Sequence, residues 1–254
     1  MSMGYNLYLT NKLLADQNSN STRDFWSLRM SAEIAGNTLW ALSKIAHMKK
    51  DKNGNYNIVG LPFEQYARMD IDWTYSQYLT DRSRLVYHLA GGIAVPYGNS
   101  KTVPFEKRYY SGGANSVRGW SVRTLGPGSY YNSNSSSNLD YFNQCGDVRF
   151  DAAVELRSKL FWKLEFATFL DAGNVWTLKD YQSQPGGKIS DDFYEQIALS
   201  TGLGLRMITG FVVLRLDMGI KTYNPYLDGR DACTICRPFK SENRVVHFAV
   251  GYPF

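Results

Sequence analysis

The segment PFEKRYYSGGANSVRGWSVRTLGPGSYY, residues 104–131, decides how the rest of this chain is interpreted. It is too long and too rich in Gly, Arg and Tyr for a hairpin turn, and it lies between two segments with the alternating pattern of β-strands. Arg118 lies near its centre, between Val117 and Gly119. An arginine near the tip of a long loop points to a partner of opposite charge elsewhere in the fold.

Alternation of apolar and charged residues recurs along the whole chain. In the segment FDAAVELRSKL, Val154 and Leu156 fall on one face of an expected strand, and Glu155 and Arg157 fall on the other. Segments with this pattern predict strands at about 5–14, 24–35, 66–79, 84–96, 147–160, 163–174, 197–208, 210–223 and 245–254.

This all-β pattern fits a soluble sandwich or a membrane barrel, and two features favour the barrel. The expected strands commonly reach ten or more residues, which suits a tilted membrane crossing. Short turns alternate with long connections at about 36–65, 97–146, 175–196 and 224–244, as in outer-membrane barrels. We therefore predict an antiparallel transmembrane β-barrel with long extracellular loops, to which this chain contributes about eight or nine strands. The stretch NTLWALSKIAHM predicts a short helix in the first of these loops.

In such a barrel the apolar face of each strand contacts lipid and the charged face lines the lumen. A shift of one residue in register would move every side chain of a strand to the opposite face, so each assignment is a stringent test. We expect lipid contact at Trp26, Met30, Ile71, Trp73, Leu156, Leu164, Leu214, Leu216 and Phe248, and lumen positions for Arg29, Asp70, Glu155, Lys163, Arg215 and Asp217.

Several function classes are disfavoured by the sequence. The chain has no G-x-S-x-G elbow, no phosphate loop with its lysine and no H-E-x-x-H motif, so we expect neither an enzyme nor a bound cofactor. The formal net charge of +5 comes without a clustered basic stripe, so nucleic acid is not an expected partner.

The three cysteines leave alternatives open. Cys233 and Cys236 form the sequence CTIC, a spacing shared by redox and zinc sites. A zinc site would need two more ligands, and the three histidines are scattered, so no metal site is predicted. Three states stay open: a disulfide between Cys233 and Cys236, a bond from one of them to Cys145, and a free pair. An outer loop faces an oxidising medium, which favours the bonded states.

Two carboxylates qualify as partners of Arg118. Glu155 and Asp171 lie on the polar faces of consecutive expected strands. If the loop folds back into the lumen, one guanidinium can bind both, because its rigid fork of donors serves two acceptors and keeps its charge. Gly119 would permit the close approach of the loop backbone. We predict that Arg118 fixes the loop to the inner wall.

An ordered set of motifs carries a resemblance to a known family. The motifs are PFEKRYYSGGANSVRGW, GDVRFDAAVELRSKL, FATFLDAGNVW, STGLGLRMITGFVVLRLDMGI and a terminal HFAVGYPF. In this order they resemble the C-terminal barrel of the BamA/TamA superfamily of outer-membrane insertases and their relatives, which include two-partner secretion transporters. The sequence RYYSGGANSVRGW followed by LGPG looks most like that of the TamA-like barrels of Bacteroidetes.

The resemblance assigns roles to single residues. Arg118 matches the arginine of the family's V-R-G-F/Y loop motif, with Trp120 in place of Phe or Tyr. Phe169, Asp171 and Gly173 match its F-x-D-x-G strand motif, and Glu155 matches the lumen-facing acid of the preceding strand. We name these residues the loop latch: Arg118, Gly119, Trp120, Glu155, Phe169, Asp171 and Gly173.

The end of the chain resembles the β-signal by which such barrels are recognised for assembly. Phe248, Val250, Tyr252 and Phe254 are expected on one face of the last strand. Pro253 has no N–H to donate, so it either weakens the seam at that strand or simply ends it.

The resemblance implies an outer-membrane protein assembly or translocation factor, with the loop at 97–146 folded into the lumen. The implied partners are outer-membrane lipids, client outer-membrane proteins and periplasmic or lipoprotein accessory subunits, and the implied location is the bacterial outer membrane. A passive pore or two-partner-type secretion channel, and a small structural membrane barrel, are the alternatives.

Residues 1–254 are expected to form one outer-membrane β-barrel domain. The odd strand count and the start of the sequence inside the family's barrel pattern indicate the C-terminal part of a larger barrel, which in the family has about sixteen strands. This sequence contains no periplasmic POTRA repeats.

Overall fold

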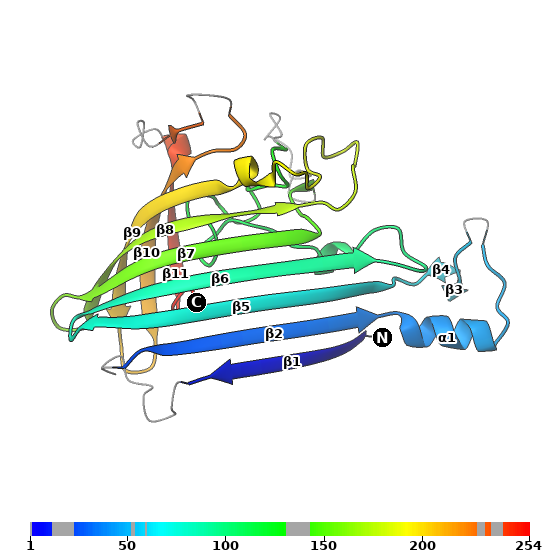
Figure 1. The fold of residues 1–254 in the computed structure, drawn as a ribbon, viewed down its shortest axis with the longest axis horizontal. Coiled ribbons are helices and arrows are strands. Elements are labelled where there is room, and N and C mark those ends of the chain that lie inside the picture. Colours follow the sequence, from blue (N-terminus) through cyan, green and yellow to red (C-terminus); the bar gives the residue numbers. More distant parts are fainter. Residues whose placement is uncertain are drawn as a thin grey trace.

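The computed structural model describes residues 2–11, 23–51, 54–58, 60–130, 143–227, 232–234 and 241–254. Within these residues, nine long strands form one sheet in which all neighbours are antiparallel (Figure 1). In order across the sheet they are β1 (Ser2–Thr10), β2 (Phe25–Ala35), β5 (Tyr66–Thr80), β6 (Ser83–Pro96), β7 (Val148–Lys159), β8 (Leu164–Trp176), β9 (Ala198–Ile208), β10 (Val213–Tyr223) and β11 (Arg244–Val250).

The smaller elements lie in the connections. Between β2 and β5 are a helix and a two-stranded hairpin, and three short 3-10 helices lie in later loops: α1 (Asn37–Ile45), β3 (Asn57–Ile58), β4 (Leu61–Pro62), η2 (Phe105–Lys107), η3 (Phe193–Gln196) and η6 (Ser241–Asn243). The short helix predicted from NTLWALSKIAHM is therefore confirmed. No helix in the described part of the chain is long and apolar enough to cross a membrane.

All nine strands predicted from alternation are present, and the long ones have the expected length. β5 contains 15 residues and β6 contains 14. At one end of the sheet three connections are short, at 81–82, 160–163 and 209–212, and residues 11–24 join β1 to β2 at the same end. The long connections and α1 gather at the other end, as the alternation of loop lengths predicted (Figure 1).

The sheet is strongly curved and encloses a concave side. β9, β10 and β11 turn away from the plane of the earlier strands (Figure 1). Among the described residues, β1 pairs only with β2 and β11 only with β10, so the sheet has two edges and does not close on itself. The predicted all-β antiparallel fold, with about eight or nine strands, is confirmed.

The two faces of the sheet differ in polarity. The convex face carries exposed apolar side chains such as Trp73, Leu156 and Leu216, whereas Arg215 and Asp217 on the concave face are buried. The predicted alternation is therefore present. Lys163 is an exception, because it lies exposed in the turn before β8 and not on the concave face.

The end of the chain does not follow the predicted single face. β11 ends at Val250, and Gly251 has a φ of +89°, a backbone conformation that glycine accepts readily. Phe248 remains on the convex face, 70% exposed. Tyr252 turns inward, where the guanidinium carbon of Arg157 lies 4.5 Å from its ring centroid.

The last residue follows the same inward path. The ring of Phe254 stacks on His88 of β6 at 4.5 Å between centroids. Pro253 is buried beyond the end of β11, so it does not interrupt the pairing of that strand. The expectation that Tyr252 and Phe254 share a face with Phe248 and Val250 is wrong, because the turn at Gly251 ends the two-residue period of the strand.

Candidate functional site

The long connection between β6 and β7 folds back against the concave face of the sheet. Its two ends meet at an antiparallel bridge between Tyr109 and Gly146, with backbone hydrogen bonds of 2.8 Å in both directions. The Tyr109 ring lies against Gly92 of β6, where a Cβ atom would come within 2.6 Å of the tyrosine hydroxyl oxygen. The missing side chain at Gly92 thus lets the loop enter the concavity.

The tip of the loop is a tight turn formed by the sequence VRGW. The Trp120 N–H donates to the Val117 carbonyl at 3.2 Å, and the Gly113 N–H donates to the Trp120 carbonyl at 2.8 Å. Val117 and Trp120 are buried in an apolar cluster with Leu125 and Ala198. Packing of these neighbours holds the turn, and the turn directs Arg118 toward the sheet.

Arg118 is fully buried and binds both carboxylates that the sequence predicted. Its Nη1 donates to Glu155 Oε2 at 2.6 Å. Its Nη2 and Nε donate to Asp171 Oδ1 and Oδ2 at 2.7 and 2.9 Å, which is a bidentate pair. The Arg118 backbone N–H adds a bond of 3.1 Å to Asp171 Oδ2. The loop is therefore joined to β7 and β8 through one side chain.

Glycine residues and one aromatic ring complete the binding site of Arg118. The Phe169 ring centroid lies 3.4 Å from the guanidinium carbon, so the cation rests on the ring face. A Cβ atom at Gly119 would lie 2.7 Å from the Cβ of Ser200, and one at Gly173 would lie 3.1 Å from Val117. A Cβ atom at Gly219 of β10 would overlap the Arg118 carbonyl oxygen. Glycines thus allow the loop backbone to touch the wall.

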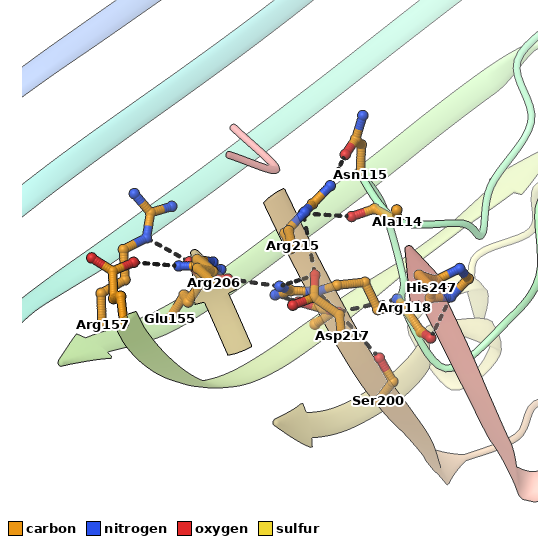
Figure 2. A network of polar contacts seen from close by, with 12 residues as sticks. Ala114, Asn115, Arg118, Glu155, Arg157, Ser200, Arg206, Arg215, Asp217 and His247 are labelled. Atoms are coloured by element: carbon orange, nitrogen blue, oxygen red, sulfur yellow. Dashed lines mark hydrogen bonds and ion pairs between the residues drawn. The ribbon is translucent and has the colours of Figure 1, made fainter. Parts of the chain in front are cut away.

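The loop latch lies within a larger buried network. Arg206 Nη2 lies 2.7 Å from Glu155 Oε1, and Arg215 Nη1 lies 3.3 Å from Asp217 Oδ2 (Figure 2). Asp217 Oδ2 also lies 3.6 Å from Arg118 Nη1. We name the whole set the arginine–carboxylate network: Arg118, Arg157, Arg206, Arg215, Glu155, Glu165, Asp171 and Asp217. Four cations meet four anions, so the formal charges cancel.

The network also binds the loop through its backbone. Arg215 Nη1 donates to the Ala114 carbonyl at 3.0 Å, and Arg215 Nη2 donates to Asn115 Oδ1 at 2.6 Å (Figure 2). On β11, the Nε2–H of His247 donates to the Arg118 carbonyl at 2.9 Å. The loop tip therefore touches β7, β8, β10 and the edge strand β11.

Sequence reasoning found the centre of this network and missed its outer part. The alternation places Arg215 and Asp217 on a polar strand face without linking them to Arg118, and Arg206 was not singled out. The link depends on cross-strand register, in which Arg215 faces Arg206 and Asp217 faces Gly204.

The predicted cysteine bond is not tested, since Cys236 lies outside the described residues. Cys233 is exposed and forms an isolated β-bridge with Tyr223 through its backbone. Cys145 is buried next to Gly146, where the two ends of the long loop meet. The described residues contain no group of three or more His, Cys, Asp or Glu side chains that could hold a metal ion.

A comparison of the sequence with protein-family models identifies the superfamily. Residues 51–254 match the family model described as the Omp85 superfamily domain. The chain belongs to the Omp85 superfamily. Membership agrees with the BamA/TamA-like resemblance of the motifs, whereas the narrower likeness to the Bacteroidetes proteins stays a prediction.

The chain is also similar to individual proteins. The outer membrane protein assembly factor BamA of Neisseria meningitidis serogroup B is 32% identical over 114 residues, which cover 39% of this chain and 13% of that protein. The crystal structure of Haemophilus ducreyi BamA lacking POTRA domains 1–3 aligns with a TM-score of 0.51 at 14% identity, over 98% of this chain and 53% of that one. CdiB from Acinetobacter baumannii aligns with a TM-score of 0.36 at 15% identity, over 98% and 41%.

These matches define how far the likeness extends. At 14% identity the agreement with the Haemophilus structure concerns the fold alone. The chain spans about half the length of that structure and a much smaller share of the Neisseria protein.

Proposed function

We propose that this Omp85 chain is an outer-membrane β-barrel domain that helps insert or translocate other proteins. Family membership supports an assembly or translocation role. The exposed apolar convex face suits contact with lipid, and the buried charges of the concave face suit a lumen. The proposed location is the bacterial outer membrane, with the long connections on the extracellular side.

The observation that carries this proposal is the position of the loop latch. Arg118 binds Glu155 and Asp171 on the wall, and its carbonyl accepts a hydrogen bond from His247 on the edge strand. One loop tip thus connects the rigid wall to β11, whose outer edge has no strand partner among the described residues.

The proposed mechanism involves no covalent chemistry. An unpaired strand edge presents backbone N–H and C=O groups that can template an incoming strand by β-augmentation. The latch would hold β10 and β11 in position while a client strand pairs with that edge. The proposed partners are client outer-membrane proteins, membrane lipids and accessory subunits on the periplasmic side, and nucleic acid is not among them.

Insertion of a client barrel by the full chain in liposomes tests this function. The variants are Arg118→Ala and, as a matched control, Lys101→Ala, which removes one exposed cation from the same loop. We expect wild type and the control to raise the rate of client insertion over empty liposomes, and Arg118→Ala to lose most of that increase. Protease protection of the client provides the readout.

Two results would reject the proposal. One is a wild-type rate no higher than that of empty liposomes. The other is full activity of Arg118→Ala. Planar-bilayer recordings of the same proteins distinguish the channel alternative, since steady conductance without client insertion would indicate a pore.

A further inference from the structure

The helix α1 is held firmly at the long-loop end of the sheet. Gly36, with a φ of +81°, lies between β2 and α1, and a Cβ atom there would come within 2.7 Å of Gln65 Cγ. Asn37 Oδ1 accepts hydrogen bonds from Tyr97 Oη at 2.8 Å and Gln65 Nε2 at 3.2 Å. The start of the helix is therefore fixed to the ends of β5 and β6, and its outward face is set by the fold.

The polarity of α1 is opposite to that of a helix on a water-soluble protein. Such a helix packs its apolar stripe inward and shows polar residues to solvent. Here the buried side chain is Ser43, at 1% exposure, whereas Leu42 is 61% exposed and Ile45 is 73% exposed. Met48, which follows the end of the helix, is also exposed. The outward face therefore suits an apolar medium.

The charged residues beside this stripe indicate which apolar medium the helix contacts. From Asn37 to Lys50 the chain has no acidic residue, but it has Lys44, Lys49 and Lys50, all exposed. Lys44 Nζ lies 5.2 Å from the ring centroid of Trp40, so a cation and an indole sit together at the border of the stripe. Indole rings and basic side chains gather where acyl chains meet head groups.

The start of α1 also adjoins the convex face of the sheet. Below the start of α1 a mainly apolar hollow of about 350 Å³ is lined by Met3, Tyr5, Ala32, Ile34 and Thr38. These strand residues belong to the face that the proposed function directs toward lipid. The hollow thus joins the apolar face of β1 and β2 to the first turn of α1.

We propose that α1 is an interfacial anchor that binds the extracellular leaflet of the membrane. Leu42 and Ile45 enter the acyl-chain border, and Lys44, Lys49 and Lys50 bind anionic phosphate head groups. The cations would also be held by the negative surface charge of such a leaflet. The inference rests on the proposed membrane location, and it adds a lipid-binding surface outside the barrel wall.

Depth-dependent fluorescence on the full chain tests the anchor. A polarity-sensitive fluorophore is attached to Ile45→Cys, Ile71→Cys or Asp191→Cys in a chain whose native cysteines are replaced by serine. Ile71 lies on the convex face of β5, and Asp191 is exposed in another long loop. Vesicles contain phosphatidylcholine with or without phosphatidylglycerol, and nitroxide groups on the acyl chains act as quenchers.

We expect quenching at Ile45 and Ile71 and none at Asp191. Replacing Lys44, Lys49 and Lys50 together by Gln should lower quenching at Ile45 in the vesicles with phosphatidylglycerol and leave Ile71 unchanged. Leu42→Asp should lower quenching at Ile45 in both kinds of vesicle.

The outcomes separate this inference from the proposed function. Quenching at Ile71 without quenching at Ile45 overturns the anchor and leaves the membrane barrel intact. An absence of quenching at both positions overturns both. Self-quenching at Ile45 that rises with the ratio of protein to lipid would instead assign the helix face to a second copy of the chain and reject the lipid anchor.

Discussion

The Nε2–H of His247 on the edge strand donates to the backbone carbonyl of Arg118 at 2.9 Å, although the two residues are separated by 129 positions in the chain. This bond joins the edge strand β11 to the same residue that binds Glu155 and Asp171. We therefore expect the state of the loop to affect the order of β11.

Replacing His247 by Phe should loosen β11 while preserving the loop latch. The ring keeps its bulk but loses the donor, which costs about 1 kcal/mol for a single hydrogen bond. Hydrogen–deuterium exchange should become faster in peptides from β11 and stay unchanged in β7. The control is Val246→Ala on the opposite face of the same strand, which leaves the contact with Arg118 in place. Equal exchange in wild type and His247→Phe would contradict the coupling.

Loss of the Arg118 side chain should destabilise the protein strongly. Arg118→Ala leaves Glu155 and Asp171 buried with one cation fewer, and breaking such a buried pair costs roughly 3–5 kcal/mol. Arg118→Lys keeps the charge but cannot form the bidentate pair, so it should recover only part of the loss. Guanidinium titration of the chain in vesicles measures the free energy of unfolding. A difference below about 1 kcal/mol for the alanine variant would mean that the site is hydrated.

A single methyl group on β10 should displace the loop. A Cβ atom at Gly219 would overlap the Arg118 carbonyl, whereas one at Gly210, in the turn before β10, would meet nothing within 4 Å. Gly219→Ala should therefore make the loop susceptible to trypsin at Arg123, and Gly210→Ala should leave the wild-type digestion pattern. Matching patterns for the two variants would show that the backbone at Gly219 can move without cost to the latch.

The inward turn at the end of the chain should contribute to stability through Tyr252. Its ring centroid lies near two guanidinium groups, 4.5 Å from the guanidinium carbon of Arg157 and 5.4 Å from that of Arg206. Cation–π contacts of desolvated groups contribute up to about 2 kcal/mol, so Tyr252→Leu should lower the free energy of unfolding by a similar amount. Val250→Ala, on the convex face before the turn, is the comparison. Denaturant titration that ranks Val250→Ala as the more destabilising change would contradict this role.

The cysteine prediction can be checked directly. We expect mass spectrometry of the protein kept free of reductant to show a mass two hydrogens below that of the reduced chain, with the bond between Cys233 and Cys236. Peptide mapping that finds a bond to Cys145 would support the alternative pairing. Three alkylated thiols would reject both.

The strands could be predicted because their faces differ so clearly. In β7 the alternation of Val154, Glu155 and Leu156 shows the two-residue period of a strand without any information on the neighbouring strands. Every long strand with such an alternation was located. The contact of Arg118 with Glu155 and Asp171 was also within reach, since both carboxylates lie in the inward phase of adjacent strands and belong to recognised motifs.

Two features could not be read from periodicity. The roles of Arg206 and Asp217 depend on the register between β9 and β10 and on the curvature of the sheet, which brings β10 opposite the loop tip. The inward path of Tyr252 depends on one glycine, Gly251, whose positive φ ends an alternation that the side chains alone would continue to Phe254. A glycine immediately before aromatic residues was the available signal, and it was interpreted as part of the strand.

The sequence separations between the loop tip and its partners on the sheet also set an order of events in time. Arg118 meets Asp171 across 53 positions, Arg215 meets Ala114 across 101, and His247 meets Arg118 across 129. Contacts between distant parts of a chain form late, because the intervening segments must be ordered first. The loop can therefore dock completely only after the last strand has joined the sheet. During biogenesis, closure of the loop would mark the moment at which the folded wall is finished.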